Sequence, residues 1–223
     1  MKVSINNLKA LLAAQTINEE QFLNSTGVKG FEELSIGKIH NFLANHNINF
    51  ENFFAYPHFL NHKQPKNIKL LLLDVDGVMT DGGMFFTENG DQFKKYNAKD
   101  GMAIMRLPKH NIQTGIISSG FKTKVVKDRA DLLKINHFYV GRENKLEVLK
   151  SWMKTLNISY SEIAMIGDDI NDLEIIKKVG FSACPADAVE VIKKNVSVVL
   201  TKKGGEGCVR ELIDYFLLPE PIE

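Results

Sequence analysis

The spacing of apolar residues changes once along the chain. In residues 1–62, apolar side chains recur at helical spacing, for example at Leu8 and Leu12 and again at Ile39 and Leu43. This pattern predicts about three or four short helices. A segment of this length buries little surface and is only marginally stable alone. We therefore expect it to dock on the rest of the chain or on a partner subunit.

In residues 63–223, short apolar segments alternate with amphipathic ones. The expected strands are Ile68–Leu73, Ile112–Ile117, His137–Val140, Ile163–Ile166, Phe181–Ala183 and Val196–Leu200. The expected helices span about residues 100–109, 122–133, 145–156, 170–179 and 207–217. Such alternation is typical of an α/β domain, a Rossmann-like parallel sheet with helices on both faces. Ligands of such sheets bind at the carboxyl ends of the strands.

Carboxylate, hydroxyl and ammonium side chains follow the expected strands directly. They are Asp74 and Asp76 after the first strand, Ser118 after the second, Lys145 at the start of the helix beyond the third, and Asp168, Asp169 and Asp172 after the fourth. Two carboxylates at about 4 Å repel by roughly 4 kcal/mol in an effective dielectric of 20. Such a cluster therefore requires a cation. Oxygen ligands without His or Cys select a hard ion, and we expect Mg²⁺.

Taken in order, these motifs resemble the four motifs of the haloacid dehalogenase-like superfamily. The matching pieces are DVDGVMTD at 74–81, Ser118, Lys145 and GDDIND at 167–172. Longer pieces, among them DVDGVMTDGGMFF, YNAKDGMAI and IGDDINDLEIIKKVGFSACPADA, are similar to the cap-less sugar-acid phosphatases of that superfamily. Those enzymes act on 3-deoxy-D-manno-octulosonate 8-phosphate or on nonulosonate 9-phosphates. The resemblance covers about residues 67–217.

The resemblance implies a Mg²⁺-dependent phosphomonoesterase for such a sugar-acid phosphate. Asp74 is then the nucleophile that becomes an aspartyl phosphate. Asp76 protonates the leaving oxygen and later deprotonates the attacking water. Ser118 and Lys145 orient the phosphoryl oxygens, although a helix cap and a solvated helix start are the structural alternatives for these two.

The resemblance also implies a ligand set for the metal. Mg²⁺ is expected on the Asp74 carboxylate, the backbone carbonyl of Asp76 and the Asp168 carboxylate. Either Asp169 or Asp172 is expected to hold metal-bound water outside this set. Asp169 is equally well explained as a helix N-cap alone.

Four further residues are candidate substrate contacts with open alternatives. Asp81 is either a turn residue or a substrate contact. Ser119 is a second candidate for the phosphate hydroxyl. Asp100 and Arg210 are expected near substrate at a subunit boundary, and Arg210 is equally well explained as a structural anchor.

One departure from the family pattern bears on the substrate. Relatives carry a Thr-Gly pair followed by a charged residue, whereas this chain has Ser118-Ser119-Gly120-Phe121. The charged side chain that helps relatives recognise their sugar acid is therefore replaced. The resemblance supports the phosphatase chemistry more firmly than the identity of the sugar.

A β-hairpin is expected over residues 83–96. Asn89-Gly90 lies between aromatic-rich runs, which is a strong hairpin signal. An isolated hairpin cannot bury its aromatic side chains, here Phe85, Phe86, Phe93 and Tyr96. We expect hairpins of neighbouring subunits to pack together, and the resemblance implies a homotetramer.

The composition of the chain limits which partners and which cellular compartment we expect. Lys and Arg number 28 against 27 for Asp and Glu, a balance that argues against nucleic-acid binding. Cys184 and Cys208 are too few for a disulfide framework and are typical of a reducing compartment. The longest strongly apolar run, Leu70–Leu73, is too short to span a bilayer. These features predict a cytoplasmic protein without a membrane anchor.

Three other functions remain as alternatives. One is a phosphatase of the same fold for another small phosphorylated metabolite. The second is a receiver-like signalling domain, against which Asp76 argues because an acid two residues after the nucleophile favours turnover. The third is a catalytically idle phosphate-binding regulatory module, which has no need of so many crowded carboxylates.

Overall fold

The computed structural model describes residues 8–9, 12, 18–45, 65–90, 92–120 and 123–218. The chain divides into two compact units, Met1–Gln64 and Pro65–Glu223. The change in apolar spacing along the sequence predicts a boundary between residues 62 and 63, which stays a prediction.

The first unit has a small helical core of its own. Its described elements are α2 (Glu19–Thr26), the short 3₁₀ turn η1 (Phe31–Glu33) and α3 (Ile36–Asn45). The Phe22 ring lies 6.0 Å from that of Phe31 and 4.7 Å, edge-on, from that of Phe42. These aromatic contacts join one side chain from each of the three elements.

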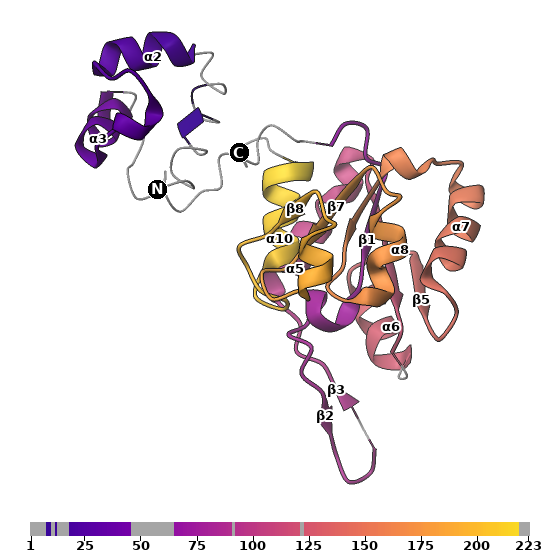
Figure 1. Ribbon diagram of the computed structural model, residues 1–223. Helices are drawn as coiled ribbons and strands as arrows, with labels where there is room; N and C mark the ends of the chain where they lie inside the picture. The colour runs from indigo at the N-terminus through magenta and orange to yellow at the C-terminus, as the bar shows by residue number, and fades with distance from the viewer. Residues whose placement is uncertain are drawn as a thin grey trace. The chain divides into compact units, whose positions relative to one another are not determined.

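The second unit is built on a parallel sheet (Figure 1). Its strands are β1 (Leu70–Leu73), β4 (Gln113–Ser118), β5 (His137–Val140), β6 (Ile163–Ile166), β7 (Phe181–Cys184) and β8 (Val198–Val199), in the spatial order β5-β4-β1-β6-β7-β8. Every described pairing in this sheet is parallel. The expected fold class is therefore confirmed, and β1 lies between β4 and β6, where ligands of such sheets bind.

One face of the sheet packs on helices from the middle of the chain. These are α7 (Lys145–Leu156) and α8 (Leu173–Ile176). Leu70 and Leu72 of β1 share a buried cluster with Leu149 of α7 and Ile175 of α8. Because side chains alternate along a strand, Leu71 and Leu73 belong to the opposite face.

That opposite face is covered by the C-terminal helix. In the sheet register Leu71 pairs with Ala164, which pairs with Phe181. The Phe181 ring lies 5.4 Å from that of Phe216, in a wide turn η7 (Ile213–Leu217) that continues α10 (Cys208–Leu212). Helix α10 also contacts α5 (Ala98–Ile104). Both faces of β1 are therefore buried, which explains its uninterrupted leucines.

Some helices differ from the expected ones. The helix expected over 100–109 is broken, because Pro108 lacks the N–H that a continuous α-helix needs at this position. Helix α5 ends at Ile104, and a 3₁₀ turn η4 follows at Leu107–His110. The remaining described helices are α6 (Thr123–Leu132) and α9 (Glu190–Lys193), the latter not expected. Among the described residues, no helix combines the length and apolarity that a bilayer crossing requires.

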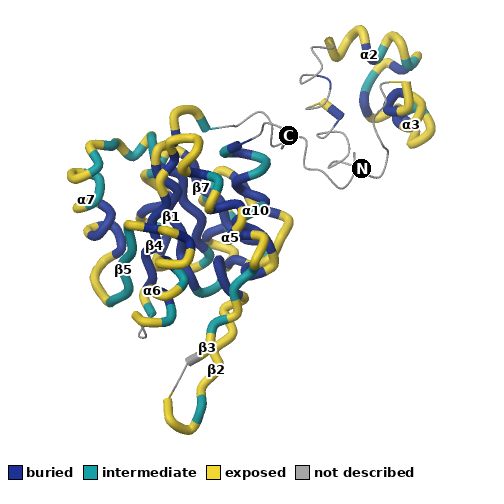
Figure 2. Tube along the Cα trace, turned by 180° about the vertical axis from the view of Figure 1, so that it is seen from behind, coloured by how far each residue is buried: buried dark blue, intermediate teal, exposed yellow. Residues whose placement is uncertain are grey.

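A β-hairpin projects from the second unit (Figure 1). Strands β2 (Phe85–Phe86) and β3 (Gln92–Phe93) pair antiparallel, with Phe85 opposite Phe93. Gly90 adopts a φ of 77° in the connection, a conformation that glycine allows without strain. Most of the described part of β2 and of the connection is exposed (Figure 2), and the side chains of Phe85 and Phe93 are largely solvent-accessible.

Helix α10 begins against a buried carboxylate from α5. Asp100 Oδ1 accepts a hydrogen bond of 2.7 Å from the backbone N–H of Arg210, which satisfies one of the free donors of the first helical turn. Its other oxygen, Oδ2, is buried without a partner among the described residues. Burial raises the pKa of Asp100 to about 6, despite the hydrogen bond from Arg210 and the charge of Arg129.

This arrangement predicts that ionisation of Asp100 destabilises the fold. A carboxyl whose pKa is raised in the folded state binds its proton more tightly there than in the unfolded chain. Stability therefore falls as pH rises from about 4 to 6, by roughly 3 kcal/mol at about 1.4 kcal/mol per pKa unit. Asp100→Asn keeps an acceptor for the Arg210 N–H but cannot ionise.

Urea unfolding at pH 4, 5, 6 and 7 checks this prediction. The Asp100→Asn protein should lose less stability than wild type across the range and be the more stable of the two at pH 7. Asp128→Asn, at an exposed position of α6, is the control and should follow wild type. Parallel pH profiles for wild type and Asp100→Asn would contradict the prediction.

Candidate active site

The first motif forms a tight turn at the carboxyl end of β1. Asp74 follows β1 directly, and its backbone N–H donates to the carbonyl of Ile166 at the end of β6. The chain then makes one wide turn, η3 (Val75–Met79), in which Gly77 has a φ of 84°. A Cβ at Gly77 would lie 2.1 Å from Asp168 Oδ2. Glycine is therefore required here both by the backbone conformation and by the close approach of Asp168.

A buried lysine joins two of the carboxylates. Lys145 is the first residue of α7, and its Nζ lies 3.0 Å from Asp74 Oδ1 and 2.7 Å from Asp172 Oδ1. The Asp172 side chain is 0% exposed and that of Lys145 4% exposed. Removing either partner of such a buried pair leaves an uncompensated charge, which costs about 3–5 kcal/mol. A solvated helix start, the alternative interpretation of Lys145, is not what the structure shows.

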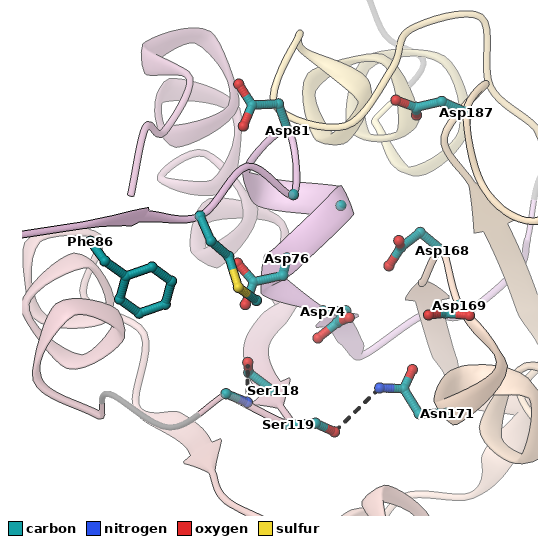
Figure 3. A pocket seen from close by; sticks show the side chains of 14 residues that line it. Asp74, Asp76, Asp81, Phe86, Ser118, Ser119, Asp168, Asp169, Asn171 and Asp187 are labelled. Carbon is teal, nitrogen blue, oxygen red and sulfur yellow. Dashed lines mark hydrogen bonds between the residues drawn. The ribbon is translucent and has the colours of Figure 1, made fainter. Parts of the chain in front are cut away.

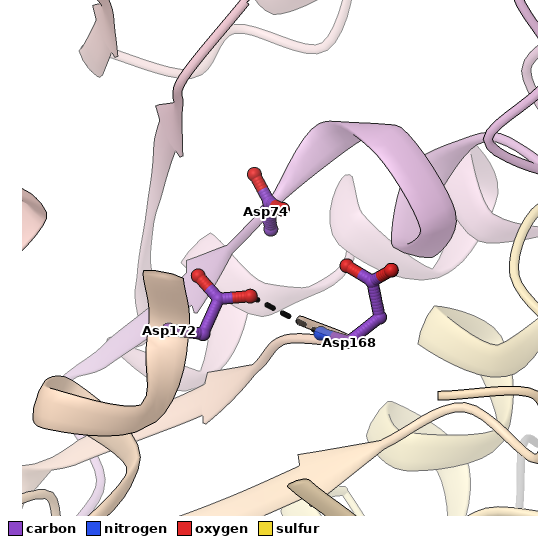
Figure 4. A group of neighbouring side chains, drawn as sticks. All are labelled: Asp74, Asp168 and Asp172. Carbon is purple, nitrogen blue, oxygen red and sulfur yellow. Dashed lines mark hydrogen bonds between the residues drawn. The ribbon is translucent and has the colours of Figure 1, made fainter. Parts of the chain in front are cut away.

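Asp168 completes a group of three carboxylates (Figure 4). Asp74, Asp168 and Asp172 each offer one oxygen within 4.8 Å of the others. Asp172 Oδ2 accepts a 3.1 Å hydrogen bond from the backbone N–H of Asp168, which fixes the two residues relative to each other. Asp168 Oδ1 is buried with no partner among the described residues. An oxygen in that position is a ready ligand for a cation.

The protein alone does not neutralise this group. Three carboxylates face one ammonium, which leaves a formal charge of −2 when all are ionised. Burial, with the charge of Asp172 added, raises the pKa of Asp74 to about 7 despite Lys145. Burial and the charge of Asp74 raise the pKa of Asp168 to about 8. For Lys145, burial lowers the pKa, but the charges of Asp74 and Asp172 outweigh it and the net direction is upward.

Carboxylates, among them Asp74 and Asp168, line much of a cavity of about 540 Å³ (Figure 3). The turn after β1 supplies Asp74 and Asp76, and the loop after β6 supplies Asp168 and Asp169. The hairpin contributes the apolar side chains of Met84 and Phe86, and the loop before α9 contributes Asp187. The cavity therefore joins a strongly acidic wall to an apolar one.

The loop after β4 brings two hydroxyls to the same cavity. Ser118 is almost fully buried, and its Oγ accepts a 3.2 Å hydrogen bond from the backbone N–H of Gly120. Ser119 Oγ accepts a 3.3 Å hydrogen bond from the side-chain amide of Asn171. In both cases the hydroxyl proton is left available to a ligand oxygen. Phe121, at the departure from the family pattern, lies outside the described residues.

Asp76 has a cation of its own. The ammonium of Lys94, which follows β3 on the returning side of the hairpin, forms an ion pair with Asp76 Oδ1. The Lys94 side chain is 3% exposed, whereas Asp76 is 25% exposed and lines the cavity. Asp76 is therefore paired with Lys94, whereas Asp74 and Asp172 are paired with Lys145.

The structure places the other expected residues in different surroundings. Asp81 lines the cavity and also pairs with Lys95 at 2.6 Å, and the hydrogen bond from Lys95 lowers the pKa of its carboxyl. Asp169 lines the cavity while its side chain accepts from the backbone N–H of Ile170 at the start of the 3₁₀ turn η6 (Ile170–Asp172). Asp172, and not Asp169, belongs to the three-carboxylate group.

Two expected substrate contacts do not line the cavity. Asp100 holds the first turn of α10, and the Arg210 guanidinium forms an ion pair with Asp214. The structure thus gives both residues a structural role within one chain. Their proposed contact with substrate at a subunit boundary stays a prediction.

Sequence reasoning missed several residues that line the cavity, and it also missed Lys94, which pairs with the cavity residue Asp76. Asn171 stands inside the matched GDDIND motif, so the sequence could place it near the site. The sequence could not predict its hydrogen bond to Ser119. Lys94 gave no local signal, because its partner Asp76 lies on another segment. Met84 and Phe86 stand at the end of the matched piece DVDGVMTDGGMFF, and Asp187 stands near the end of IGDDINDLEIIKKVGFSACPADA, but the sequence assigned none of the three to the site.

Comparison with known proteins places these residues in a family. The family model for haloacid dehalogenase-like hydrolases matches residues 118–212. The 3-deoxy-D-manno-octulosonate 8-phosphate phosphatase of Salmonella typhimurium is 38% identical over 164 residues, which cover 74% of this chain and 86% of the relative.

Solved structures agree with the sequence comparison. The 3-deoxy-D-manno-octulosonate 8-phosphate phosphatase of Yersinia pestis superposes with a TM-score of 0.66 at 38% identity, covering 68% of this chain and 82% of the other. The Moraxella catarrhalis enzyme of the same name, solved with a magnesium ion, a phosphate ion and a KDO molecule, gives a TM-score of 0.67 at 32% identity, covering 70% and 90%. The chain therefore belongs to the haloacid dehalogenase-like hydrolases and is a phosphatase of that family.

Proposed function

We propose that this phosphatase is a Mg²⁺-dependent phosphomonoesterase that works through an aspartyl phosphate on Asp74. The observation that carries the proposal is the group of Asp74, Asp168 and Asp172: Lys145 joins Asp74 to Asp172, and Asp74 and Asp168 line the cavity. Phosphoryl transfer depends on positioning and electrostatics. It therefore requires a nucleophile and positively charged groups that offset the charge of the phosphoryl oxygens.

Each residue takes one part in this reaction. An oxygen of Asp74 attacks phosphorus, and the bond to the leaving oxygen breaks with its electron pair. Asp76 gives that oxygen a proton and then takes one from the water that hydrolyses the intermediate. Ser118 donates from its hydroxyl to a phosphoryl oxygen, with Ser119 as a second donor, and the ammonium of Lys145 offsets the charge on the phosphoryl group.

The residues present fit a magnesium ion. The donor set is carboxylate oxygen only, Asp168 Oδ1 lacks another partner among the described residues, and the formal charge of the group matches a divalent cation. Asp74 and Asp168, with the backbone carbonyl of Asp76, are the proposed ligands, and Asp172 sets the orientation of Asp168. When bound, the ion would neutralise the nucleophile and the phosphoryl oxygens.

We propose 3-deoxy-D-manno-octulosonate 8-phosphate as the first candidate substrate, with nonulosonate 9-phosphates beside it. The names of the relatives in Salmonella and Yersinia support the former. One observation favours another small phosphorylated metabolite instead. Among the described residues lining the cavity there is no lysine or arginine, whereas a sugar acid carries a carboxylate that needs a cation.

We further propose a homotetramer built through the hairpins. The exposed aromatic side chains of Phe85, Phe86 and Phe93 support this, because apolar side chains gathered on a projecting hairpin mark an interaction surface. A cytoplasmic setting is proposed on separate grounds: Cys184 and Cys208 are both buried free thiols, as expected in a reducing compartment.

The nucleophile assignment predicts the loss of turnover in Asp74→Asn. Hydrolysis of p-nitrophenyl phosphate with Mg²⁺ should fall by about a thousandfold or more. An idle regulatory module would show no turnover even in wild type. Wild-type rates in the Asp74→Asn protein would contradict the assignment.

A substrate panel separates the two candidate substrate classes. It should contain phosphates of eight- and nine-carbon keto sugar acids together with common hexose phosphates. The sugar-acid proposal expects the highest kcat/KM among the former. A clear preference for a hexose phosphate would contradict it.

The metal proposal predicts a rise in thermal stability on adding Mg²⁺. A ligand that binds only the folded state at one hundred times its Kd adds about 2.7 kcal/mol. Asp168→Asn should abolish that gain, because it removes a ligand oxygen and part of the charge that attracts the ion. Asp128→Asn, on the exposed face of α6, should retain it. An equal gain in the Asp168→Asn protein would contradict the proposed site.

The assembly proposal predicts that Phe85→Ser with Phe93→Ser breaks the tetramer. The two side chains are opposite each other in the hairpin, so the double change removes one apolar face. Sedimentation velocity at micromolar concentration should show tetramers for wild type and smaller species for the variant. Leu132→Ser, at an exposed position of α6, should stay tetrameric. A monomeric wild-type protein would refute the assembly.

A further inference from the structure

The ion pair between the hairpin and the first motif is the feature that the proposed function leaves unexplained. Lys94 stands just after β3, and Asp76 stands in the turn after β1. We propose that Lys94 is a positioning residue that holds the carboxylate of Asp76 by one oxygen and presents the other to the reacting phosphate ester. This inference rests on the proposed function, because it assigns Asp76 the role of acid and base.

The two oxygens of Asp76 have different surroundings. Oδ1 forms the ion pair with Lys94 and lies 3.4 Å from the hydroxyl oxygen of Thr80. Oδ2 faces the loop after β4, lying 3.9 Å from the point that a Cβ on Gly120 would occupy. Both described hydrogen bonds to this carboxylate therefore end on Oδ1. Oδ2 is the oxygen left to exchange a proton with a ligand.

The burial of Lys94 and Asp76 supports the same arrangement. Lys94 is more deeply buried than Asp76, and only Asp76 belongs to the cavity wall. The ammonium therefore lies behind the carboxylate and not between it and a ligand. A cation in this place orients the acid without taking up the position of the leaving group.

The next lysine along the chain shows that the arrangement is specific. Lys95 is 69% exposed and pairs with Asp81 at the end of the first motif. Of the two adjacent lysines, only Lys94 has a buried side chain and pairs with Asp76. The hairpin thus contributes an orienting cation to the active site of its own chain.

The physical consequence concerns proton transfer. Without Lys94, the Asp76 carboxylate loses its strongest tether and is free to turn toward the metal group or toward solvent. A general acid or base that is misplaced by about 1 Å loses much of its effect. Because general acid–base catalysis contributes about 10²–10⁴-fold as a whole, we expect the loss of its positioning residue to cost only part of that factor and not to weaken substrate binding.

Lys94→Met tests this with two substrates that differ only in the leaving group. Phenyl phosphate needs a proton on its leaving oxygen, whereas 2,4-dinitrophenyl phosphate does not. Single-turnover release of phenol should fall by about 10–100-fold in the variant, and release of 2,4-dinitrophenol by less than about threefold. KM for both should change little, because Lys94 is absent from the cavity wall.

A double-mutant cycle shows whether Lys94 acts through Asp76. In an Asp76→Asn background, adding Lys94→Met should lower phenol release by no more than about a further twofold. Lys69→Met is the matched control, since it breaks an ion pair with Glu162 at the opposite end of β1 and should leave both rates at wild-type values. Retention of the Mg²⁺-induced rise in Tm shows that the Lys94→Met protein is folded with its metal group intact.

The outcomes of these experiments test the role of Lys94 separately from the proposed phosphatase function. Equal losses with both substrates, equal losses in both backgrounds, or no loss at all would each overturn the role of Lys94. These results leave the phosphatase mechanism standing as long as wild type turns over. Absence of wild-type turnover with either ester would overturn the proposed function itself, and the inference with it.

Discussion

The bridge that Lys145 makes between Asp74 and Asp172 is the interaction on which the rest of the site depends. It brings carboxylates from the ends of β1 and β6 together in a place where almost no water reaches them. One ammonium is enough to hold the group but not to neutralise it, and burial together with the neighbouring carboxylates raises the pKa values of Asp74 and Asp168 to about 7 and about 8. The fold thus maintains a negative charge for which a divalent cation is the natural partner.

The other features of the active site hold these negatively charged carboxylates close together. Gly77 lets the chain turn where a side chain would collide with Asp168. The backbone N–H of Asp168 binds Asp172 and fixes the loop after β6. Asp76, in the turn after β1, pairs with a different cation, Lys94 of the hairpin. Cations from segments far apart in sequence therefore pair with Asp74 and with Asp76.

Most of this arrangement was predictable where the signal was local. Asp74, Asp168 and Ser118 stand at strand ends, and parallel strands bring their carboxyl ends to one edge. The contacts that sequence could not give depend on geometry between segments. Asp172 rather than Asp169 joins the group because a 3₁₀ turn separates them. Asp100 accepts a hydrogen bond from Arg210 at the start of α10, and the hairpin brings Lys94 to Asp76. The spacing of apolar residues reveals neither contact.

The account as a whole is tested most directly by a crystal structure with Mg²⁺ and orthovanadate, which imitates a phosphoryl group during transfer. We expect vanadium beside an oxygen of Asp74, the ion shared by Asp74 and Asp168, and Asp76 Oδ2 next to the oxygen opposite Asp74. A complex in which Asp74 is remote from both the ion and the vanadate would contradict the account.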